Sequence, residues 1–453
     1  MPINVRDEIS DYKKLKEVKK KLEGDLRKKL LLKSLYYCGA KVAACFSFGA
    51  VAVVKNKKQA KFVGNSSCKS PWCCPVCTAR KMAKYAAKIS SALDALRYRG
   101  FCAAMLTFTI PHTADFSCEE ATEILYNTWK AFTVHGNKVL QASKNDIFSN
   151  FAEATNHKHR VRVTEYTYGQ KGWHPHFHCL FWFPQENFQD IIEWETALNQ
   201  RWLQLAERYT IKILSRRPEY SKKNSSCVGT PQTNSSVVVD DVQQFEDGFS
   251  RLKQRIAIMY KKMDTEGSKG VFISKDSSGN PIEQLSSNYL CGWGGDKEIT
   301  GNFNEKATRA GHMSWQQILD AAISGNDEKY WNLYFEYAEA TRKYRHTRVN
   351  FSVHSGICKI IAEWQNSEGY KEYLKKKNTE YAKAVGTWKT VCFFNESQWY
   401  SICTRHLEVE ILEAAKSEFA FDEISKILTA NGISPPLQCE AWTEMLDSAL
   451  NAA

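Results

Sequence analysis

Three histidines alternate along an apolar stretch near the middle of the chain, WHPHFHCLFWF at residues 173–183. The aromatic and branched residues of this stretch predict a buried β-strand, on which side chains two residues apart share a face. His174, His176 and His178 are therefore expected on one face. Burying three imidazoles without partners is costly, and a bound metal ion is the simplest compensation.

A preceding strand adds a carboxylate to this face. Residues 160–168 alternate as a strand, and GQKG at 169–172 is typical of a hairpin turn. If the turn is centred between residues 170 and 171, Glu165 lies opposite His176, at a Cβ distance of roughly 5 Å. We therefore expect Glu165, His176 and His178 to form a divalent-ion site. The alternative is that Glu165 only forms an ion pair with a partly charged histidine.

Cysteines form a second cluster near the N-terminus, CKSPWCCPVC at residues 68–77. A Cys-x2-Cys pair on a tight turn brings two thiolates together, as a tetrahedral zinc site requires. Cys74 and Cys77 have this spacing, and Cys73 with Cys77 is an overlapping option. This pattern predicts two of the four ligands of a structural zinc ion.

The remaining zinc ligands must come from nearby cysteines. Cys68 is a natural third ligand because it lies just before the turn. The fourth is Cys38, which is followed by glycine, or Cys45. A redox-active Cys-x2-Cys pair is the competing interpretation of the cluster.

The histidine-rich hairpin resembles a known family. The pattern E-x-T-x-G-x-x-G-W-H-P-H-x-H at residues 165–178 is similar to that of the rolling-circle replication initiators of small plasmids, which are HUH endonucleases. In these enzymes two histidines flank a hydrophobic residue. The resemblance, which spans roughly residues 35–355, implies that His176 and His178 form this pair and that His174 is an outer or DNA-facing group.

The resemblance also selects among the cysteines. Family members commonly carry Cys-Gly and then Cys-x5-Cys-Pro-x-Cys, which the chain matches around residues 38–39 and 68–77. Cys73 is then a bystander. The zinc ligands implied by the resemblance are Cys38, Cys68, Cys74 and Cys77.

A nucleophilic tyrosine is the third feature that the resemblance implies. The family carries it in Tyr-x-x-Lys followed by Trp-Gly, and the chain has Tyr289 in the context Asn-Tyr-Leu-x-x-Trp-Gly. Gly292 stands where the family has lysine, and Lys297, further along, is a possible substitute. Tyr337 and Tyr344 are rival nucleophiles, although aromatic residues at helical spacing more often belong to a core.

The resemblance implies a function in DNA replication. The protein would nick single-stranded or hairpin origin DNA with Mn²⁺ or Mg²⁺, form a 5′-phosphotyrosine and leave a free 3′-OH that primes synthesis. Host helicase and polymerase are implied partners. Residues expected to contact DNA are Arg80, Lys84, Trp173, His174 and Lys297.

Two other function classes fit parts of the pattern. The chain can be a DNA-binding relative of the initiators that lost cleavage together with the motif lysine. Two histidines and one carboxylate also bind iron in non-haem oxygenases. The cysteine cluster and the basic charge make the oxygenase the weaker of these alternatives.

Strand and helix patterns alternate around these motifs and predict the α+β class, and the resemblance implies an HUH-type antiparallel sheet flanked by helices. Residues 101–111 predict a further strand, and residues 119–140 and 186–214 predict helices. The expected divisions are a basic helical arm (1–34), a zinc-binding module (35–100), the nuclease domain (101–300), its helical extension (301–353) and a mainly helical C-terminal domain of unknown role (354–453).

Composition indicates which class of partner and which cellular location to expect for this chain. The 453 residues include 62 Lys and Arg against 50 Asp and Glu, a net charge of +12 that favours a polyanionic partner. No apolar run reaches the ~18 residues that a membrane span needs, and the first residues lack a secretory apolar segment. We therefore expect a cytoplasmic protein without a membrane partner. The 15 cysteines then favour metal ligation and buried thiols over disulfides.

Overall fold

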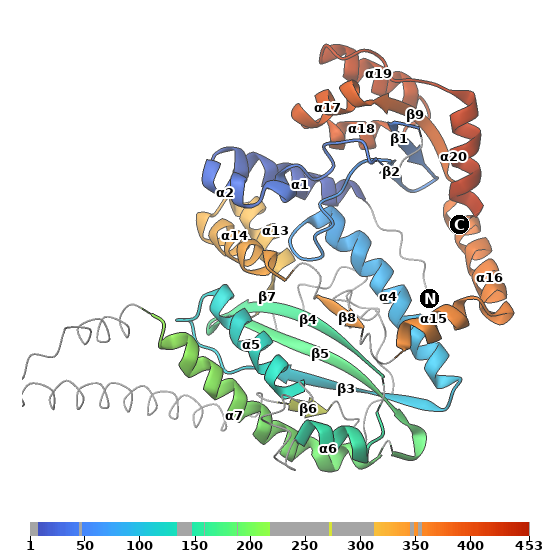
Figure 1. Cartoon of the computed structure of the whole chain (residues 1–453). Coiled ribbons are helices and arrows are strands. Elements are labelled where there is room, and N and C mark those ends of the chain that lie inside the picture. Colours follow the sequence, from blue (N-terminus) through green and yellow to red (C-terminus); the bar gives the residue numbers. More distant parts are fainter. Residues whose placement is uncertain are drawn as a thin grey trace, which may run out of the picture.

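The computed structural model describes residues 8–44, 48–133, 147–157, 159–187, 189–217, 271–273, 312–344, 348–351 and 356–452. Within these residues the fold belongs to the predicted α+β class, with antiparallel sheets flanked by helices (Figure 1).

The larger sheet has six antiparallel strands and carries the histidine-rich hairpin at its centre. The strand order is β6-β3-β5-β4-β7, and β8 also pairs with β4. The strands are β3 (Phe101–Thr109), β4 (His159–Gly169), β5 (Gly172–Pro184), β6 (Val271–Ile273), β7 (Met313–Ser314) and β8 (Val349–Phe351). The sheet therefore combines three long strands that are close in sequence with three short strands from distant segments.

The register of the β4–β5 hairpin confirms the pairing predicted from the turn. Glu165 pairs with His176 and Val163 pairs with His178. Gly172 ends the turn with φ of +83°, and a Cβ atom on it would lie 3.0 Å from the Cα atom of Ala114. Glycine is needed there because other residues rarely adopt this conformation and the space is filled.

Helices cover both faces of this sheet (Figure 1). Helices α5 (Cys118–Thr133), α6 (Ile147–Ala154) and α7 (Glu195–Leu214) pack on one face, over an aromatic core that includes Phe108, Phe177 and Trp202. On the other face, α4 (Pro75–Arg97) and α15 (Ile357–Gln365) cover Val163 and Leu180. The predicted helix 186–214 instead begins as 3-10 turns at Gln185–Asn187 and Gln189–Trp194.

A smaller sheet joins the two ends of the chain. Its order is β2-β1-β9, made by β1 (Ala50–Lys55), β2 (Ala60–Val63) and β9 (Lys389–Asn395). The segment expected as a separate C-terminal domain thus supplies a strand to the N-terminal module. The segment is mainly helical, with α16 (Glu368–Val385), α17 (Glu396–Thr404), α18 (Glu408–Ala414), α19 (Ala420–Ala430) and α20 (Glu440–Ala452).

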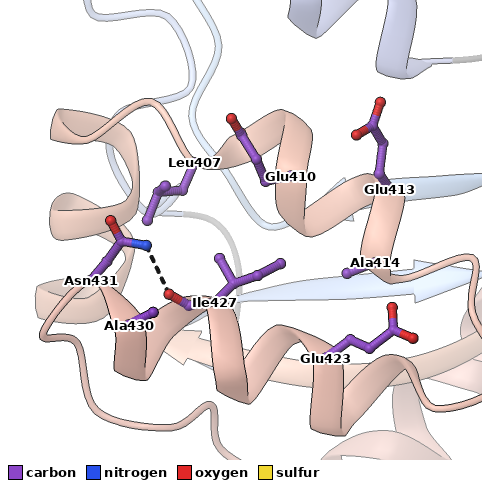
Figure 2. Close-up of a pocket in the computed structure, with 8 residues that line it drawn as sticks. All are labelled: Leu407, Glu410, Glu413, Ala414, Glu423, Ile427, Ala430 and Asn431. Atoms are coloured by element: carbon purple, nitrogen blue, oxygen red, sulfur yellow. Dashed lines mark hydrogen bonds between the residues drawn. The ribbon is translucent and has the colours of Figure 1, made fainter.

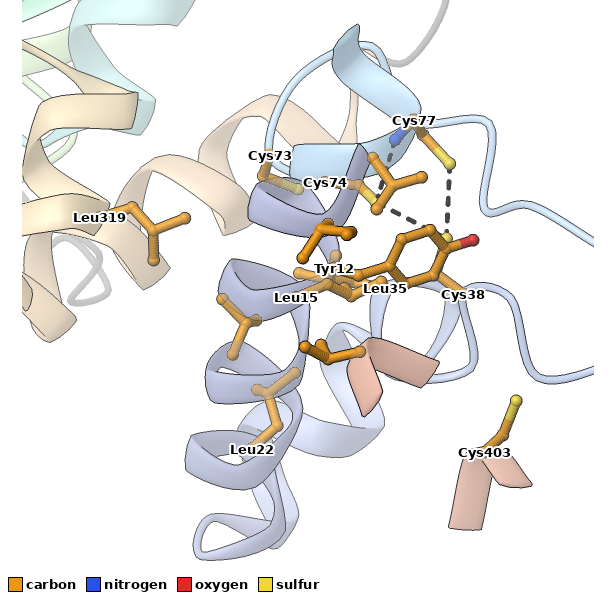
Figure 3. Packing of buried hydrophobic residues seen from close by; sticks show 14 of the residues in the cluster. Tyr12, Leu15, Leu22, Leu35, Cys38, Cys73, Cys74, Cys77, Leu319 and Cys403 are labelled. Atoms are coloured by element: carbon orange, nitrogen blue, oxygen red, sulfur yellow. Dashed lines mark hydrogen bonds between the residues drawn. The ribbon is translucent and has the colours of Figure 1, made fainter. Parts of the chain in front are cut away.

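The N-terminal segment, expected as a basic helical arm, packs against the core. It forms α1 (Glu8–Glu23), α2 (Leu26–Leu31) and α3 (Lys33–Tyr36). Tyr12, Leu15 and Leu22 of α1 are buried in the largest hydrophobic cluster, beside the cysteines (Figure 3). This cluster also includes α13 (Trp315–Gly325) and α14 (Glu328–Arg342). No helix among the described residues has the length and apolarity to cross a membrane.

Lysines of α1 bind the C-terminal helices through ion pairs. A groove of about 590 Å³ between α18 and α19 is lined by Glu410 and Glu413 (Figure 2). Lys16 lies 2.7 Å from Glu410 and Lys13 lies 2.7 Å from Glu413. The acidic side chains of this groove therefore help to hold α1 in place.

A third lysine of α1, Lys19, forms an ion pair that can be tested by mutation because it is buried in the protein. Its Nζ atom lies 3.0 Å from Oε1 of Glu408, with side chains 4% and 6% exposed. Lys19→Met should lower the free energy of unfolding by about 3–5 kcal/mol, because it leaves a buried carboxylate uncompensated. Lys20→Met, which breaks an exposed pair with Glu17, should cost less than about 1 kcal/mol. If chemical denaturation shows that both variants lose the same free energy of unfolding, the structural role of the Lys19–Glu408 pair is contradicted.

Candidate metal centres

The hairpin brings the predicted divalent-ion ligands together. Oε2 of Glu165 lies 3.0 Å from Nε2 of His178 and 3.3 Å from Nε2 of His176. The three ligand atoms lie within 4.8 Å of one another. The antiparallel register produces this arrangement, because it places Glu165 directly across from His176 and diagonally across from His178.

Neighbouring groups orient both imidazoles. Nδ1 of His176 lies 3.2 Å from the carbonyl oxygen of His174, and Nδ1 of His178 lies 3.0 Å from Oγ1 of Thr107 on β3. A carbonyl only accepts, so Nδ1 of His176 carries a hydrogen, and Nε2 of the same ring is directed toward Glu165. Such outer contacts fix ring orientation at metal sites, and the trio therefore fits a divalent ion.

The carboxylate is ionised in this setting. Burial alone would raise the pKa of Glu165, but hydrogen bonds and charge from His176 and His178 outweigh burial and hold its pKa well below the usual range. The Glu165 side chain is 38% exposed, whereas each imidazole is 10% exposed. A ligand from solvent would therefore approach the site from the carboxylate side.

Further histidines surround the trio. The His174 ring stacks on His112 with centroids 4.5 Å apart, and on His176 with centroids 4.9 Å apart. The ring centroid of His312 lies 6.2 Å from that of His174. Burial, together with the electrostatic influence of His176, lowers the pKa of His312. His312 was not among the residues expected here. It precedes β7, which reaches the hairpin through a long-range pairing that the sequence pattern does not reveal.

The four expected zinc ligands also converge. The sulfur atoms of Cys38, Cys68, Cys74 and Cys77 lie within 4.8 Å of one another, with Cys38 3.4 Å from Cys77 and 3.6 Å from Cys74 (Figure 3). Four cysteines fit a structural metal such as zinc. The Cys73 sulfur instead lies 3.7 Å from Oγ of Ser70, as expected of a bystander, and Cys45 lies outside the described residues.

Of the rival nucleophiles, Tyr337 occupies a core position and Tyr344 is half-buried beside the core. Tyr337 is 1% exposed, its hydroxyl lies 3.5 Å from the carbonyl oxygen of Trp72, and its ring stacks on Trp173. Tyr344 stacks on Tyr126, whose hydroxyl bonds Thr164 on the sheet face opposite Glu165. Neither tyrosine faces the divalent-ion trio. The alternative nucleophile Tyr337 is therefore a packing residue, because its ring is enclosed by other aromatic side chains.

The expected nucleophile and one expected DNA contact, Tyr289 and Lys297, lie outside the described residues. The remaining residues that were expected to contact DNA differ in their burial. Trp173 is buried and donates from Nε1 to Glu336 at 3.0 Å. Arg80 makes two hydrogen bonds with Glu8, of 3.1 and 2.7 Å. Trp173 and Arg80 therefore hold the fold together, whereas Lys84 is exposed on α4.

Comparisons with known proteins give one partial match. No family model matches the chain, and no solved structure matches it significantly. A neomycin resistance protein of Streptomyces cyanogenus is 27% identical over 134 residues, which cover 26% of this chain and 30% of that protein. Because the chain spans less than a third of that protein's length, this similarity does not assign the chain to a family.

Proposed function

We propose that this protein is a rolling-circle replication initiator that nicks single-stranded or hairpin DNA at an origin and rejoins the strands. The observation that carries the proposal is the convergence of Glu165, His176 and His178 on one face of a central hairpin. Two imidazoles and one carboxylate suit Mn²⁺ and, more weakly, Mg²⁺. A bound ion of this kind would neutralise charge on a non-bridging phosphate oxygen and orient the phosphate.

The proposed reaction is a transesterification by Tyr289. Its hydroxyl oxygen forms a bond to phosphorus, the bond between phosphorus and the 3′ oxygen breaks, and the 3′ oxygen takes up a proton. The products are a 5′-phosphotyrosine and a free 3′-OH that can prime synthesis. A free phenol has a pKa near ~10 and needs charge stabilisation to attack at neutral pH. Because the tyrosine ester retains the phosphodiester linkage, the strands can be rejoined without ATP.

The surroundings of the trio support this role. The sheet with β3 and β5 side by side is compatible with an HUH-type platform. His112, His174 and His312 lie beside the trio and add imidazole groups to this part of the sheet. The excess of basic residues agrees with DNA as a partner, and we extend the proposal to a cytoplasmic location with host helicase and polymerase as partners.

A non-catalytic DNA-binding protein is the second candidate. Gly292 favours it, because a lysine at this position would help to stabilise the phenolate or bind phosphate. This candidate retains DNA binding and metal binding but forms no covalent product. The two functions therefore differ in a single measurable step.

Substitution of the tyrosine tests the proposal. Single-stranded DNA from the region around the gene of this protein is incubated with the protein and Mn²⁺, and covalent adducts are separated by denaturing electrophoresis. The wild type should form an adduct, Tyr289→Phe should form none, and Tyr337→Phe should still form the adduct. An adduct that persists in Tyr289→Phe contradicts the assigned nucleophile, and DNA binding without any adduct favours the non-catalytic candidate.

A further inference from the structure

The turn that carries the cysteines is held by a segment that also contacts the larger sheet. We define residues 68–77 as the Cys knuckle. Three consecutive carbonyl oxygens of this knuckle, at residues 71, 72 and 73, accept hydrogen bonds from Arg348, Tyr337 and Tyr334, respectively. The contact from Tyr334 is 2.7 Å long, and that from Tyr337 is 3.5 Å. Side chains of α14 and of the residue before β8 thus fix the backbone of the knuckle.

Arg348 makes contacts in two directions. Its side chain is buried, donates to the carbonyl oxygen of Pro71 and lies over the ring of Trp72, with Cζ 5.4 Å from the centroid. Its own carbonyl oxygen accepts from the backbone N–H of Thr164 at 2.7 Å. Thr164 directly precedes Glu165 on β4. One residue therefore links the Cys knuckle to the strand that carries the metal-binding carboxylate.

Trp72 makes a second link to the same strand. Its ring meets Tyr166 edge to face, with centroids 5.6 Å apart, and its Nε1 atom donates to the carbonyl oxygen of Tyr344 at 2.8 Å. Tyr166 directly follows Glu165. Both chain neighbours of Glu165 therefore contact the assembly formed by the knuckle and Arg348, so the position of the carboxylate depends on this assembly.

We propose that Arg348 is a positioning residue that couples the two metal centres. An ordered Cys knuckle holds the Arg348 guanidinium, Arg348 holds β4 at Thr164, and this contact fixes the Glu165 carboxylate toward His176 and His178. The inference rests on the proposed divalent site. Zinc in the knuckle then tightens divalent-ion binding in the hairpin, and because such coupling is reciprocal, the divalent ion tightens zinc binding by the same factor.

The test measures Mn²⁺ affinity rather than DNA cleavage. Mn²⁺ is titrated into zinc-loaded protein, and free ion is read from its electron paramagnetic resonance signal. Arg348→Met keeps most of the side-chain bulk but removes the guanidinium, and it should bind Mn²⁺ about tenfold more weakly than the wild type, as changes next to metal ligands do. Arg342→Met is the matched control, since Arg342 is exposed and also donates to a carbonyl, that of Leu31. It should leave the Mn²⁺ affinity unchanged.

Two variants that delete only a hydroxyl group test the same coupling if Arg348→Met does not fold. Tyr334→Phe deletes the hydroxyl that donates to Cys73 and should also weaken Mn²⁺ binding, whereas Tyr330→Phe on the same helix should not. Zinc content and circular dichroism confirm that each variant is folded and loaded. Wild-type Mn²⁺ affinity in folded, zinc-loaded Arg348→Met, or in Tyr334→Phe if the first variant does not fold, overturns the coupling. Absence of Mn²⁺ binding in the wild type instead contradicts the proposed function.

Discussion

Glu165→Gln should abolish metal-dependent nicking while leaving the protein folded. Glutamine has nearly the same shape, but it lacks the negative charge that faces His176 and His178 at 3.3 and 3.0 Å. We expect divalent-ion affinity and nicking rate to fall by at least about 100-fold, because charge stabilisation at the reacting phosphate is lost. The measurement combines Mn²⁺ titration with the adduct assay.

A matched control separates this effect from a general loss of surface charge. Glu363→Gln removes a carboxylate on the exposed face of α15 that pairs with Arg99 at 2.7 Å. It should nick at the wild-type rate. Nicking by Glu165→Gln at the wild-type rate would contradict the role of Glu165 as a metal ligand.

Cys74→Ser should release the bound zinc and destabilise the N-terminal module. Cys74 is fully buried among the other three cysteines and caps the start of α4 by accepting from the Cys77 N–H at 3.4 Å. Structural zinc contributes on the order of 10 kcal/mol to the folding of small metal-binding units. Zinc content should therefore fall to near zero, and the midpoint of thermal unfolding should fall with it.

Cys73→Ser is the control for this substitution because Cys73 is the adjacent cysteine. Its sulfur contacts Ser70 and does not belong to the group of four sulfurs that could hold a metal, so the variant should keep its zinc. Zinc retained by Cys74→Ser but lost from Cys73→Ser would show that the ligand assignment is wrong. A redox-active pair predicts a different result, namely a disulfide that forms reversibly and does not depend on zinc.

Local patterns predicted the convergence of Glu165, His176 and His178 because these residues belong to one hairpin. The turn sets the register, and the register alone places Glu165 opposite His176. Short-range spacing also pointed to the cysteines of residues 68–77, but only the resemblance selected Cys38 over Cys45 and Cys74 over Cys73. For both predicted metal centres, the proximity of most residues can therefore be predicted with little knowledge of the overall fold.

Contacts between distant segments were not predictable in this way. β7 and β8 are three residues long or shorter and join the hairpin from far along the chain, and His312 arrives with β7. Helical periodicity does not tell what the polar face of α1 meets. The lysines of that face bind Glu408, Glu410 and Glu413 of α18, so the segment expected as a basic helical arm joins the two ends of the chain.

Mass spectrometry of the protein–DNA product tests the central claim most directly. The protein is incubated with Mn²⁺ and single-stranded DNA from the region around its gene, and then digested with protease and nuclease. We predict a nucleotide 5′-phosphate attached to the peptide that contains Tyr289, and loss of this product in Glu165→Gln. A modified peptide without Tyr289, or DNA binding with no modified peptide, would contradict metal-assisted nicking by this tyrosine.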